Sequence, residues 1–553
     1  MNRKMAKGAV SQFVIFTGSL TLLCVLSFPF AVNAATAVPQ PGESIRDTRP
    51  RQQVSLEHVD TDNKQAPRSV RFTLQEIRVE HEGLHVKDEK ITAITDKIIG
   101  KEITAAELNA AVADITHYVR SYGYPAAAAY IPEQTAVDGR LLVKVEPGRI
   151  GKVQLVNESG LKDKAAERML AGLKPGDIIR TRKVENSLYN LRDLSGVEVQ
   201  GVLSPGAEQG TSDITVRVTN KKKTSVVLYS ENYGSESAGR YRYGLQGEVR
   251  NLSGTGDRLN LGALLSNKQQ HNYNISYETT LGRSASRLGL GFSRADYDLG
   301  NVFAALGAEG VANTYSLYGR TTLWNTSGSA LALTYGYDYR DITDELKTFG
   351  VSWKKHSHVV HLGLDGFGRG SRSRVQYNAT VYTGKLVPDS EMADILGTLG
   401  RTKGHFTKVT ADVTAVQGIG RNFDVLLKLS GQKAANNLDS SEHIILGGAR
   451  GVRAYPQGEA SGDEGMLGTL ELRYHTPVKG LVLSTYFDAG HVRVEKEAGD
   501  SMTLKGWGIG LTYSKPDDWF ARFDYARRIG SDDAMSDEAR SRQRMWFIAG
   551  KVF

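Results

Sequence analysis

The side chains best able to carry out catalysis or to bind a metal are sparse in this sequence. The only tight histidine cluster is His356, His358 and His361. On a β-strand the first two would share one face and the third would point to the other, so a three-ligand zinc site is not expected. The sequence contains no phosphate-binding loop and singles out no nucleophile with its base. We therefore predict that the protein is not an enzyme and uses no cofactor and no metal.

A second stretch stands out by composition. Residues Gly447 to Gly465 read GGARGVRAYPQGEASGDEG, which is rich in glycine and in charge and has no strand pattern. The stretch lies between two segments in which apolar and polar residues alternate. A polar loop of this length needs specific contacts if it is to keep one position.

The segments around this loop have the pattern of β-strands. From residue 221 onward helical periods disappear and apolar residues alternate with polar ones, as in Tyr273, Ile275 and Tyr277. A soluble sandwich would need a second sheet to cover the apolar face, whereas a transmembrane β-barrel turns that face toward lipid. The sequence therefore favours a barrel over residues 221–553, with a length that allows roughly 14 to 18 strands.

The N-terminus has the features of an export signal. A basic start precedes an apolar run that ends in Ala-Val-Asn-Ala, and we predict that residues 1–34 form a cleaved signal peptide, with an uncleaved membrane anchor as the alternative. Cys24 is the only cysteine and lies inside this segment, so the mature protein is expected to have no disulfide. The net charge of +8 is spread along the chain, which argues against nucleic-acid binding.

Two units of similar order are predicted between the signal and the barrel. Residues 35–67 are rich in Pro, Gln, Arg and Asp and are expected to form a flexible linker with, at most, a short N-terminal helix. Residues 68–148 and residues 149–220 each predict the order β-α-α-β-β. In the first unit, Thr104 and Glu107 have the spacing of a capping box at the start of a helix.

Three stretches of the chain resemble a known family. They are GYPAAAAYIPEQTAVDGRLLVKVEPGRIGKVQL between the two units, ENYGSESAGRYRYGLQGEVRNLSGTGDRLNL at the start of the predicted barrel, and the glycine-rich loop. Over nearly all of its mature length the chain is similar to the outer-membrane transporters of two-partner secretion, the TpsB family of haemolysin secretion and activation type. The resemblance implies a mainly β protein, with a 16-stranded antiparallel transmembrane barrel preceded by two periplasmic POTRA domains.

The resemblance also assigns a role to the loop of about residues 447–465. In the superfamily the sixth extracellular loop folds back into the barrel and carries a Val-Arg-Gly-aromatic motif. The matching residues, with the glycine before them, are Gly451, Val452, Arg453, Ala454 and Tyr455. The arginine of the family is held by an aspartate of the barrel wall, in a stretch matched here by Tyr486, Asp488 and Gly490. A guanidinium and a carboxylate shielded inside a barrel can form such a pair in bidentate fashion.

Three further expectations concern the motif, the last strand and the N-terminal segment. Ala454 replaces the glycine of the family motif, and a backbone with positive φ would be strained there. Phe553 ends an alternating strand and is expected to serve as the outer-membrane assembly signal. The segment between Pro41 and Pro50 has room for about two helical turns, whereas a plug helix that crosses the bilayer needs about 20 residues.

The function that the resemblance implies is protein transport across the bacterial outer membrane. The POTRA domains would recognise an unfolded exoprotein, haemolysin-like or adhesin-like, in the periplasm, and the barrel would pass it to the cell surface. The expected partners are this exoprotein, which the transporter could also activate, outer-membrane lipid and the barrel assembly machinery; the chain is expected to be a monomer that binds no nucleic acid. The alternatives are an outer-membrane protein assembly factor of the same superfamily and a passive porin.

Overall fold

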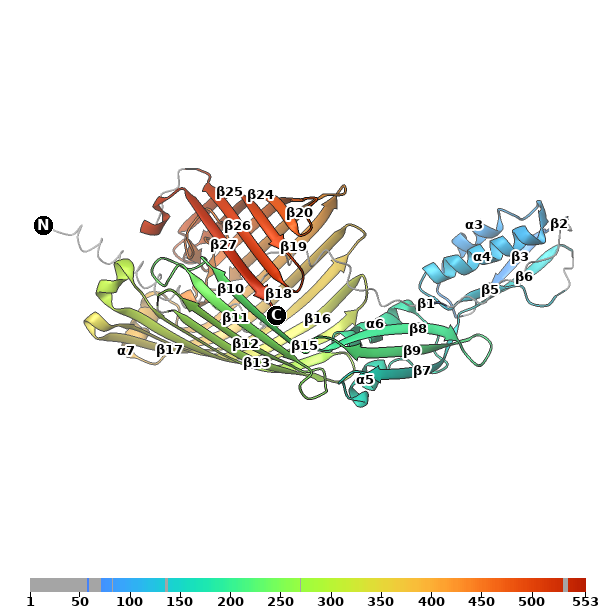
Figure 1. The fold of residues 1–553 in the computed structure, drawn as a ribbon, viewed down its shortest axis with the longest axis horizontal. Coiled ribbons are helices and arrows are strands. Elements are labelled where there is room, and N and C mark those ends of the chain that lie inside the picture. The colour runs from blue at the N-terminus through green and yellow to red at the C-terminus, as the bar shows by residue number, and fades with distance from the viewer. Residues whose placement is uncertain (1–56, 59–70, 82, 135–137, 269, 531–535) are drawn as a thin grey trace.

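The computed structural model describes residues 57–58, 71–81, 83–134, 138–268, 270–530 and 536–553. The predicted signal peptide, most of the predicted linker and the segment between Pro41 and Pro50 lie outside the described residues. The described chain is mainly β, as predicted, and consists of a closed barrel and two small domains that extend from one end of it (Figure 1). No helix among these residues is long and apolar enough to cross a membrane.

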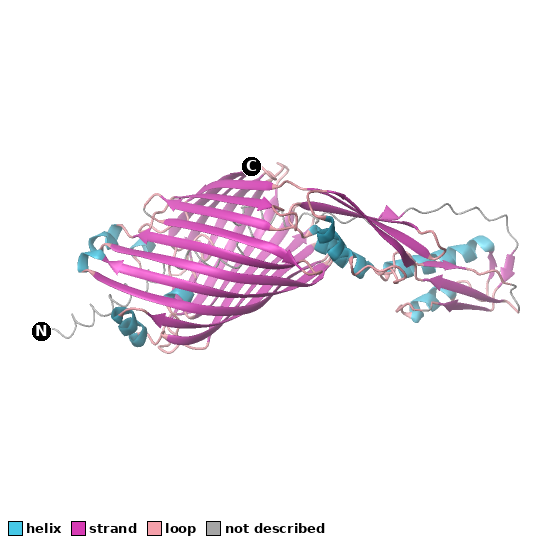
Figure 2. Cartoon of the chain, turned by 90° about the horizontal axis from the view of Figure 1, so that it is seen from below, coloured by secondary structure: helices cyan, strands magenta, loops and turns pink. Residues whose placement is uncertain are grey.

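Sixteen antiparallel strands form the barrel, which is the number implied by the resemblance. Each strand pairs with its neighbour in the chain, and the last strand pairs with the first to close the cylinder (Figure 2). The strands are β10 (Thr224–Glu231), β11 (Arg242–Arg250), β12 (Arg258–Ser266), β13 (His271–Leu281), β14 (Ser286–Asp298), β15 (Ala308–Asn325), β16 (Ser329–Leu346), β17 (Val351–Arg369), β18 (Ser373–Pro388), β19 (Gly404–Ile419), β20 (Phe423–Ala434), β23 (Glu464–His475), β24 (Leu481–Arg493), β25 (Ser501–Ser514), β26 (Trp519–Arg528) and β27 (Gln543–Val552).

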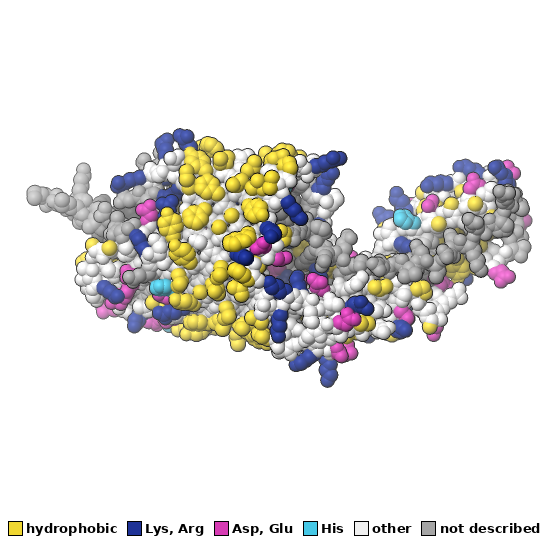
Figure 3. All heavy atoms as spheres, viewed as in Figure 1, with side chains coloured by type: hydrophobic (Ala, Val, Ile, Leu, Met, Phe, Trp, Pro, Cys, Tyr) yellow, Lys and Arg dark blue, Asp and Glu magenta, His cyan; other side chains and the backbone are white. Residues whose placement is uncertain are grey.

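The outer face of the barrel is apolar and the inner face is polar. On β13, Tyr273, Ile275 and Tyr277 are 44%, 45% and 39% exposed, whereas Asn272 and Ser276 are 7% and 6% exposed. On the face of the barrel seen in Figure 3, the apolar side chains form a band. A closed sheet leaves no unpaired edge inside the bilayer, and the band turns toward lipid. The alternation read from the sequence therefore follows from a barrel with a wet interior.

Short helices and strands lie in the connections between the barrel strands. At the end of the barrel far from the small domains, α7 joins β18 to β19 (Figure 1). The connecting elements are η1 (Asn301–Leu306), η2 (Lys347–Phe349), α7 (Glu391–Leu399), η3 (Ser440–Glu442), β21 (Ile444–Ile445), β22 (Ser461–Gly462) and η4 (Asp537–Arg540).

The first small domain packs two helices on a three-stranded sheet of order β3-β6-β5. Its elements are β2 (Arg71–Thr73), β3 (Glu76–Glu80), α3 (Asp88–Thr95), β4 (Glu102–Thr104), α4 (Ala105–Ser121), β5 (Ala128–Tyr130) and β6 (Arg140–Glu146). Thr104 and Glu107 form the predicted capping box at the start of α4. The first predicted strand is split, because Phe72 and Leu74 differ in parity from Ile77 and Val79. A bend between β2 and β3 lets both pairs reach the core, and β2 pairs with β4 instead.

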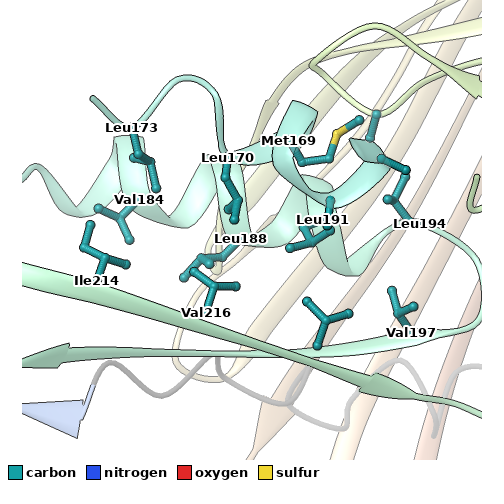
Figure 4. Packing of buried hydrophobic residues seen from close by; sticks show 14 of the residues in the cluster. Met169, Leu170, Leu173, Val184, Leu188, Leu191, Leu194, Val197, Ile214 and Val216 are labelled. Carbon is teal, nitrogen blue, oxygen red and sulfur yellow. The ribbon is translucent and has the colours of Figure 1, made fainter. Parts of the chain in front are cut away.

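The second small domain has the predicted order β-α-α-β-β. Its elements are β7 (Arg149–Glu158), α5 (Asp163–Leu170), α6 (Thr181–Arg192), β8 (Val197–Pro205) and β9 (Thr211–Asn220), and β1 (Glu57–His58) adds to its sheet in the order β1-β8-β9-β7. Figure 4 shows how the helices pack on the sheet, with Leu188, Leu191 and Val216 at 0% exposure. This buried layer gives the domain a core of its own.

The second small domain is bonded to the turns at one mouth of the barrel. In the turn between β15 and β16, the backbone N–H of Asn325 donates to Asn186 Oδ1 of α6 at 2.9 Å, and its Nδ2 donates to Asp193 Oδ2 at 2.7 Å. The hydroxyl of Ser327 donates to Glu185 Oε1 at 2.9 Å. These contacts fix the domain on one side of the mouth.

Candidate functional site

The glycine-rich loop between β20 and β23 folds into the barrel and packs on its inner wall. Its two arms pair through β21 and β22, and the pairing continues from the N–H of Leu446 to Ala460 O at 2.9 Å. At the tip, Val452 and Tyr455 are 0% and 1% exposed. A β-carbon at Gly451 would lie 1.9 Å from Leu446 O, so only glycine fits this turn.

Arg453 lies at the tip and bonds to a carboxylate of the barrel wall. Its Nε and Nη2 each lie 2.8 Å from an oxygen of Asp488 on β24, and its backbone N–H donates to the same carboxylate at 3.2 Å. Arg453 is 5% exposed and Asp488 is 1% exposed. The geometry is that of a bidentate, charge-assisted pair out of contact with bulk water. The structure thus brings together the two residues that the family motifs pair.

Three other charged residues complete this cluster. Nη1 of Arg453 lies 3.2 Å from Glu471 Oε2 on β23 and 3.3 Å from Asp524 Oδ1 on β26. Arg522 on β26 donates to the same Glu471 oxygen at 3.1 Å and, through Nε, to Asp524 Oδ2 at 2.7 Å. Three carboxylates therefore share two guanidinium groups. Removing Arg453 would leave buried anions with too few partners, which is costly in a shielded site.

Aromatic rings on the wall hold the same arginine. The Cζ of Arg453 lies 3.2 Å from the centroid of the Tyr486 ring, and the Tyr486 hydroxyl donates to Tyr525 O at 3.2 Å. On β27, the indole N–H of Trp546 donates to the backbone carbonyl of Arg453 at 2.7 Å. The cation over the ring adds to the ion pair, and the indole fixes the backbone on its other side. We call Arg453 with Asp488, Glu471, Asp524 and Tyr486 the tip anchor.

Glycines on β25 make room for the loop tip at one position and for side chains of the tip anchor at the next ones. Gly506, Gly508 and Gly510 alternate along the strand and are buried on its lumenal face. A β-carbon at Gly506 would lie 2.6 Å from the β-carbon of Ala454, and one at Gly508 would lie 2.4 Å from the ring of Tyr486. The wall is thus flat where the loop touches it.

Ala454 and Gly490 each have a local role. Ala454 is not among the described non-glycine residues with positive φ, so the strain expected of an alanine at this motif position does not arise. Within the loop, Ala460 has the left-handed backbone instead, with φ 54. A β-carbon at Gly490 would lie 3.0 Å from Leu446 Cδ2, so the glycine leaves room for Leu446 of the loop to pack on β24.

Glu471, Asp524, Arg522 and Trp546 were not identified by the sequence reasoning. Each lies at a lumenal position of a strand whose alternating neighbours face lipid, for example Leu470 at 52% exposure beside Glu471 at 2%. Buried charge in an alternating strand was therefore an available signal. Which of these charges meet depends on strand register and barrel closure, which no local pattern provides.

The histidines do not form a site. His356 and His358 lie on the outer face, where they bond to Asp389 and to the Tyr337 hydroxyl at 2.7 and 2.6 Å, whereas His361 faces inward and is 2% exposed. Among the described residues, no group of three or more His, Cys, Asp or Glu is placed to hold a metal ion. Phe553 lies at the seam of the barrel, where its backbone N–H donates to Val226 O at 2.8 Å.

Comparisons with known proteins give matches over most of the chain. Residues 210–513 match the model of the haemolysin secretion/activation protein ShlB/FhaC/HecB, and residues 72–148 match the ShlB-type POTRA domain. The heme/hemopexin transporter protein HuxB of Haemophilus influenzae is 25% identical over 504 residues, which cover 88% of each chain. The outer membrane transporter CdiB of Dickeya dadantii is 23% identical over 457 residues, which cover 80% of each chain.

A solved structure shares the whole architecture. CdiB from Escherichia coli superposes with a TM-score of 0.68 at 18% identity, and the match covers 92% of this chain and 96% of that one. CdiB from Acinetobacter baumannii gives a TM-score of 0.62 at 16% identity. At these identities the likeness concerns the fold, and it extends over the barrel and both small domains.

Proposed function

This chain belongs to the haemolysin secretion/activation family of outer-membrane transporters, and from that premise we propose that its POTRA domains capture an unfolded exoprotein while the tip anchor controls passage through the barrel. The barrel spans the bacterial outer membrane, and the two small domains are POTRA domains that lie in the periplasm. The exoprotein would enter from the periplasmic mouth and fold at the cell surface.

The position of the loop is the observation that carries this proposal. The tip of the loop is buried against the inner wall of β23 to β27, inside the space through which a polypeptide would have to pass. A passive porin needs no such closure. The tip of this loop is held mainly by one guanidinium, so the tip can be released by breaking the contacts of a single side chain. Release of Arg453 is therefore the proposed opening step.

Strand addition is the proposed mode of capture. We call the first and second small domains POTRA 1 and POTRA 2. In the sheet of POTRA 2, among the described residues, β7 pairs with β9 on one side and has no neighbouring strand on the other. Its ten residues, Arg149–Glu158, give an extended edge of backbone donors and acceptors. An added strand is recognised through its backbone and tolerates varied side chains, which suits a moving substrate. POTRA 2 is bonded to the barrel, so a segment held there lies close to the mouth.

We also infer a monomer that is assembled from its own C-terminus. All sixteen strands of the barrel come from one chain, which leaves no open barrel edge for a second copy to complete. Phe553 bonds to Val226 on β10, the first strand of the barrel, so Phe553 lies where the barrel closes. Recognition of Phe553 by the assembly machinery would act on the step that seals this seam.

The test is a pair of arginine variants. Arg453→Ala removes the tip anchor, and Arg421→Ala removes an exposed arginine of the turn between β19 and β20 and serves as the control. Both proteins are produced in cells that also express the exoprotein, and barrel insertion is checked by heat-dependent gel mobility. We expect Arg453→Ala to insert and to lose most secretion, and Arg421→Ala to secrete normally. Normal secretion by inserted Arg453→Ala would refute the proposed role of the loop.

A second test addresses capture. Deletion of residues 68–220 removes both POTRA domains and leaves the barrel strands intact. We expect the truncated protein to conduct ions in a bilayer but to bind no exoprotein in a pull-down. Secretion at the level of the full chain would show that capture occurs elsewhere.

A further inference from the structure

The infolded loop is held at a second place, far from its tip. Asp439 precedes η3, and its Oδ2 lies 2.7 Å from Lys355 Nζ on β17. Glu442 ends η3, and its two oxygens lie 2.8 Å from Arg340 on β16 and 2.8 Å from Lys408 on β19. We call these five residues the stem anchor.

The stem anchor is largely shielded, although less completely than the tip anchor, and its most exposed side chains, Arg340 and Asp439, are 17% and 13% exposed. The side chains of Glu442, Lys355 and Lys408 are 7%, 9% and 10% exposed. Lys408 Nζ and Gln432 Nε2 also donate to the backbone carbonyl of Glu442, each at 2.8 Å. Both the carboxylate and the backbone of the loop are therefore bonded to the wall at this point.

The two anchors have opposite polarity. At the tip, a loop cation lies among wall carboxylates on β23, β24 and β26. At the stem, loop carboxylates lie among wall cations on β16, β17 and β19. If the loop slid from one arc of the wall to the other, like charges would meet in a shielded space, which is unfavourable. The charges therefore specify where each end of the loop belongs.

The two anchors differ in redundancy. In the tip anchor, a single loop side chain, Arg453, makes the ion pairs to the wall carboxylates. At the stem, Asp439 and Glu442 act together, and Asp463 ties the two arms of the loop to each other. Asp463 Oδ1 accepts a bond from Leu438 N at 2.9 Å and lies 3.0 Å from His443 Nε2, while its Oδ2 accepts from Lys496 N at 2.8 Å. Freeing the stem requires several independent bonds to break at once.

The charge of the stem is also firmly held. Burial alone would raise the pKa of Asp439, but the ammonium of Lys355 and hydrogen bonds from Ser441 more than offset it and lower the pKa to about 2. Asp439 thus keeps its charge over the pH range in which bacteria grow. Loss of this anchor by protonation is not expected.

We propose that Asp439 and Glu442, bonded to Arg340, Lys355 and Lys408, form a fixed pivot about which the Arg453 tip of the loop moves during transport. The inference rests on the proposed function, because it assumes that the tip moves. It adds that the loop does not leave the barrel as a unit. The stem stays on β16, β17 and β19, and the tip swings from the wall of β23 to β27.

Spin-label distances in the purified full-length protein test the pivot directly. One label is placed at residue 399 on α7, which is 77% exposed, and the second is placed either at residue 440 in the stem or at residue 450 near the tip. Cys24, the only native cysteine, lies in the predicted signal peptide, so the introduced cysteines are expected to be the only labelling sites of the mature protein. In Arg453→Ala we expect the 399–450 distribution to broaden and the 399–440 distribution to stay as in the wild type. Equal broadening at both positions would overturn the pivot.

A matched pair on β17 tests the charges of the stem. Lys355 faces the lumen and Lys354 is exposed on the outer face, so Lys355→Gln and Lys354→Gln remove the same charge from opposite sides of one strand. We expect Lys355→Gln to broaden the 399–440 distribution and to raise open-channel events in planar bilayers severalfold, and Lys354→Gln to change neither. If Lys355→Gln fails to insert, Glu442→Gln with Asp341→Asn on the outer face as control gives the same comparison. If the 399–440 distance distribution stays as narrow in Lys355→Gln or Glu442→Gln as in the wild type, the proposal is contradicted.

These measurements need no exoprotein, so they separate the two hypotheses. Failure of the spin-label test removes the pivot and leaves the transport role standing. Normal secretion by Arg453→Ala removes the transport role of the tip, while an unmoved stem in the same variant still shows a stable second anchor.

Discussion

The barrel holds two other parts of the same chain, the lumenal loop and POTRA 2, and it binds them by different chemistry. The loop tip is fixed by a buried cluster of full charges around Arg453. POTRA 2 is fixed mainly by hydrogen bonds to turns, such as Lys162 N to Gly254 O at 2.8 Å and Ser195 N to Gly256 O at 3.2 Å, with Leu194 packed on Gly256. Arg258 and Arg287 reach the same domain from the barrel.

The difference concerns what happens when one partner is lost. In the lumen, a truncated partner leaves a charge buried without a counterion, so a single change has a large effect. At the mouth, the bonds are many and individually modest, so a single change weakens the dock without releasing it. Under the proposed function this arrangement suits the two parts, because the loop tip would move as a switch while the receptor domain would stay in place.

The largest expected effect is that of Asp488→Ala. Removing this carboxylate breaks the bidentate pair and leaves Arg453 to Glu471 and Asp524, which already share Arg522. We expect the seated position of the loop to lose about 3 kcal/mol, in the range measured for one broken partner of a buried pair. The measurement is the fraction of closed time of single channels in a planar bilayer. Asp341→Ala on the outer face is the control, and channels as closed as the wild type in Asp488→Ala would contradict the comparison.

A smaller effect is expected for Asn325→Ala at the dock. The change removes the side-chain bond to Asp193 and keeps the backbone bond to Asn186, so we expect a cost of about 1 to 2 kcal/mol. Amide exchange in α6 should become faster while exchange in the loop at residues 447–460 stays unchanged. Faster exchange in the loop would mean that the dock and the gate are coupled, contrary to their separate chemistry.

A single substitution at the junction between POTRA 1 and POTRA 2 should cost still less free energy. There the N–H of Thr181 donates to Gly123 O at 2.9 Å, and the guanidinium of Arg180 lies 5.7 Å from the ring centroid of Tyr124. Arg180→Ala should cost about 0.5 to 1 kcal/mol and widen the spread of angles between the domains, as measured by small-angle scattering. Lys183→Ala, which removes an exposed cation from the same helix, should leave the spread unchanged. A rigid junction in Arg180→Ala would show that apolar packing alone holds the two domains.

The smallest effect is expected at the helix cap of POTRA 1. Hydrogen bonds from the backbone and hydroxyl of Thr104 lower the pKa of Glu107 below its ordinary value. A lowered pKa in the folded state means that the cap stabilises α4 above the ordinary glutamate pKa and that this contribution is lost as the pH falls through the lowered value. Amide exchange in the first turn of α4, corrected for intrinsic rates, should therefore become faster at acid pH. Glu107→Gln should remove this dependence, and an unchanged profile in that variant would exclude the carboxylate as its cause.

The sequence indicated which face of the barrel a side chain lies on, but it did not indicate which lumenal side chains contact each other. Alternation on β13 and β17 correctly separated lipid-facing from lumenal side chains, including His356 and His358 from His361. The bidentate pair of Arg453 and Asp488 was reached through a family motif, since 35 positions separate the two residues. The partners Glu471 and Asp524 follow from the register of neighbouring strands. That register is set by the closure of the whole barrel, so no window of sequence contains it.

The stem anchor was missed for a related reason. Asp439 and Glu442 look like ordinary acidic residues of a polar loop, and Arg340, Lys355 and Lys408 look like ordinary polar positions of three strands. Only the closed barrel brings these strands around the loop. The split of the first POTRA strand, in contrast, was already visible as a change of parity between Leu74 and Ile77.

The absence of a side chain at Gly506 on β25 has a consequence for how closely the loop tip can approach the wall. Gly506 faces the lumen without a side chain, so Ala454 of the tip packs directly on the peptide backbone of β25. A methyl group at Gly506 would clash with Ala454 and would keep Arg453 from reaching Asp488. The missing side chain at Gly506 therefore contributes, together with the charges of the tip anchor, to how closely the tip approaches the wall.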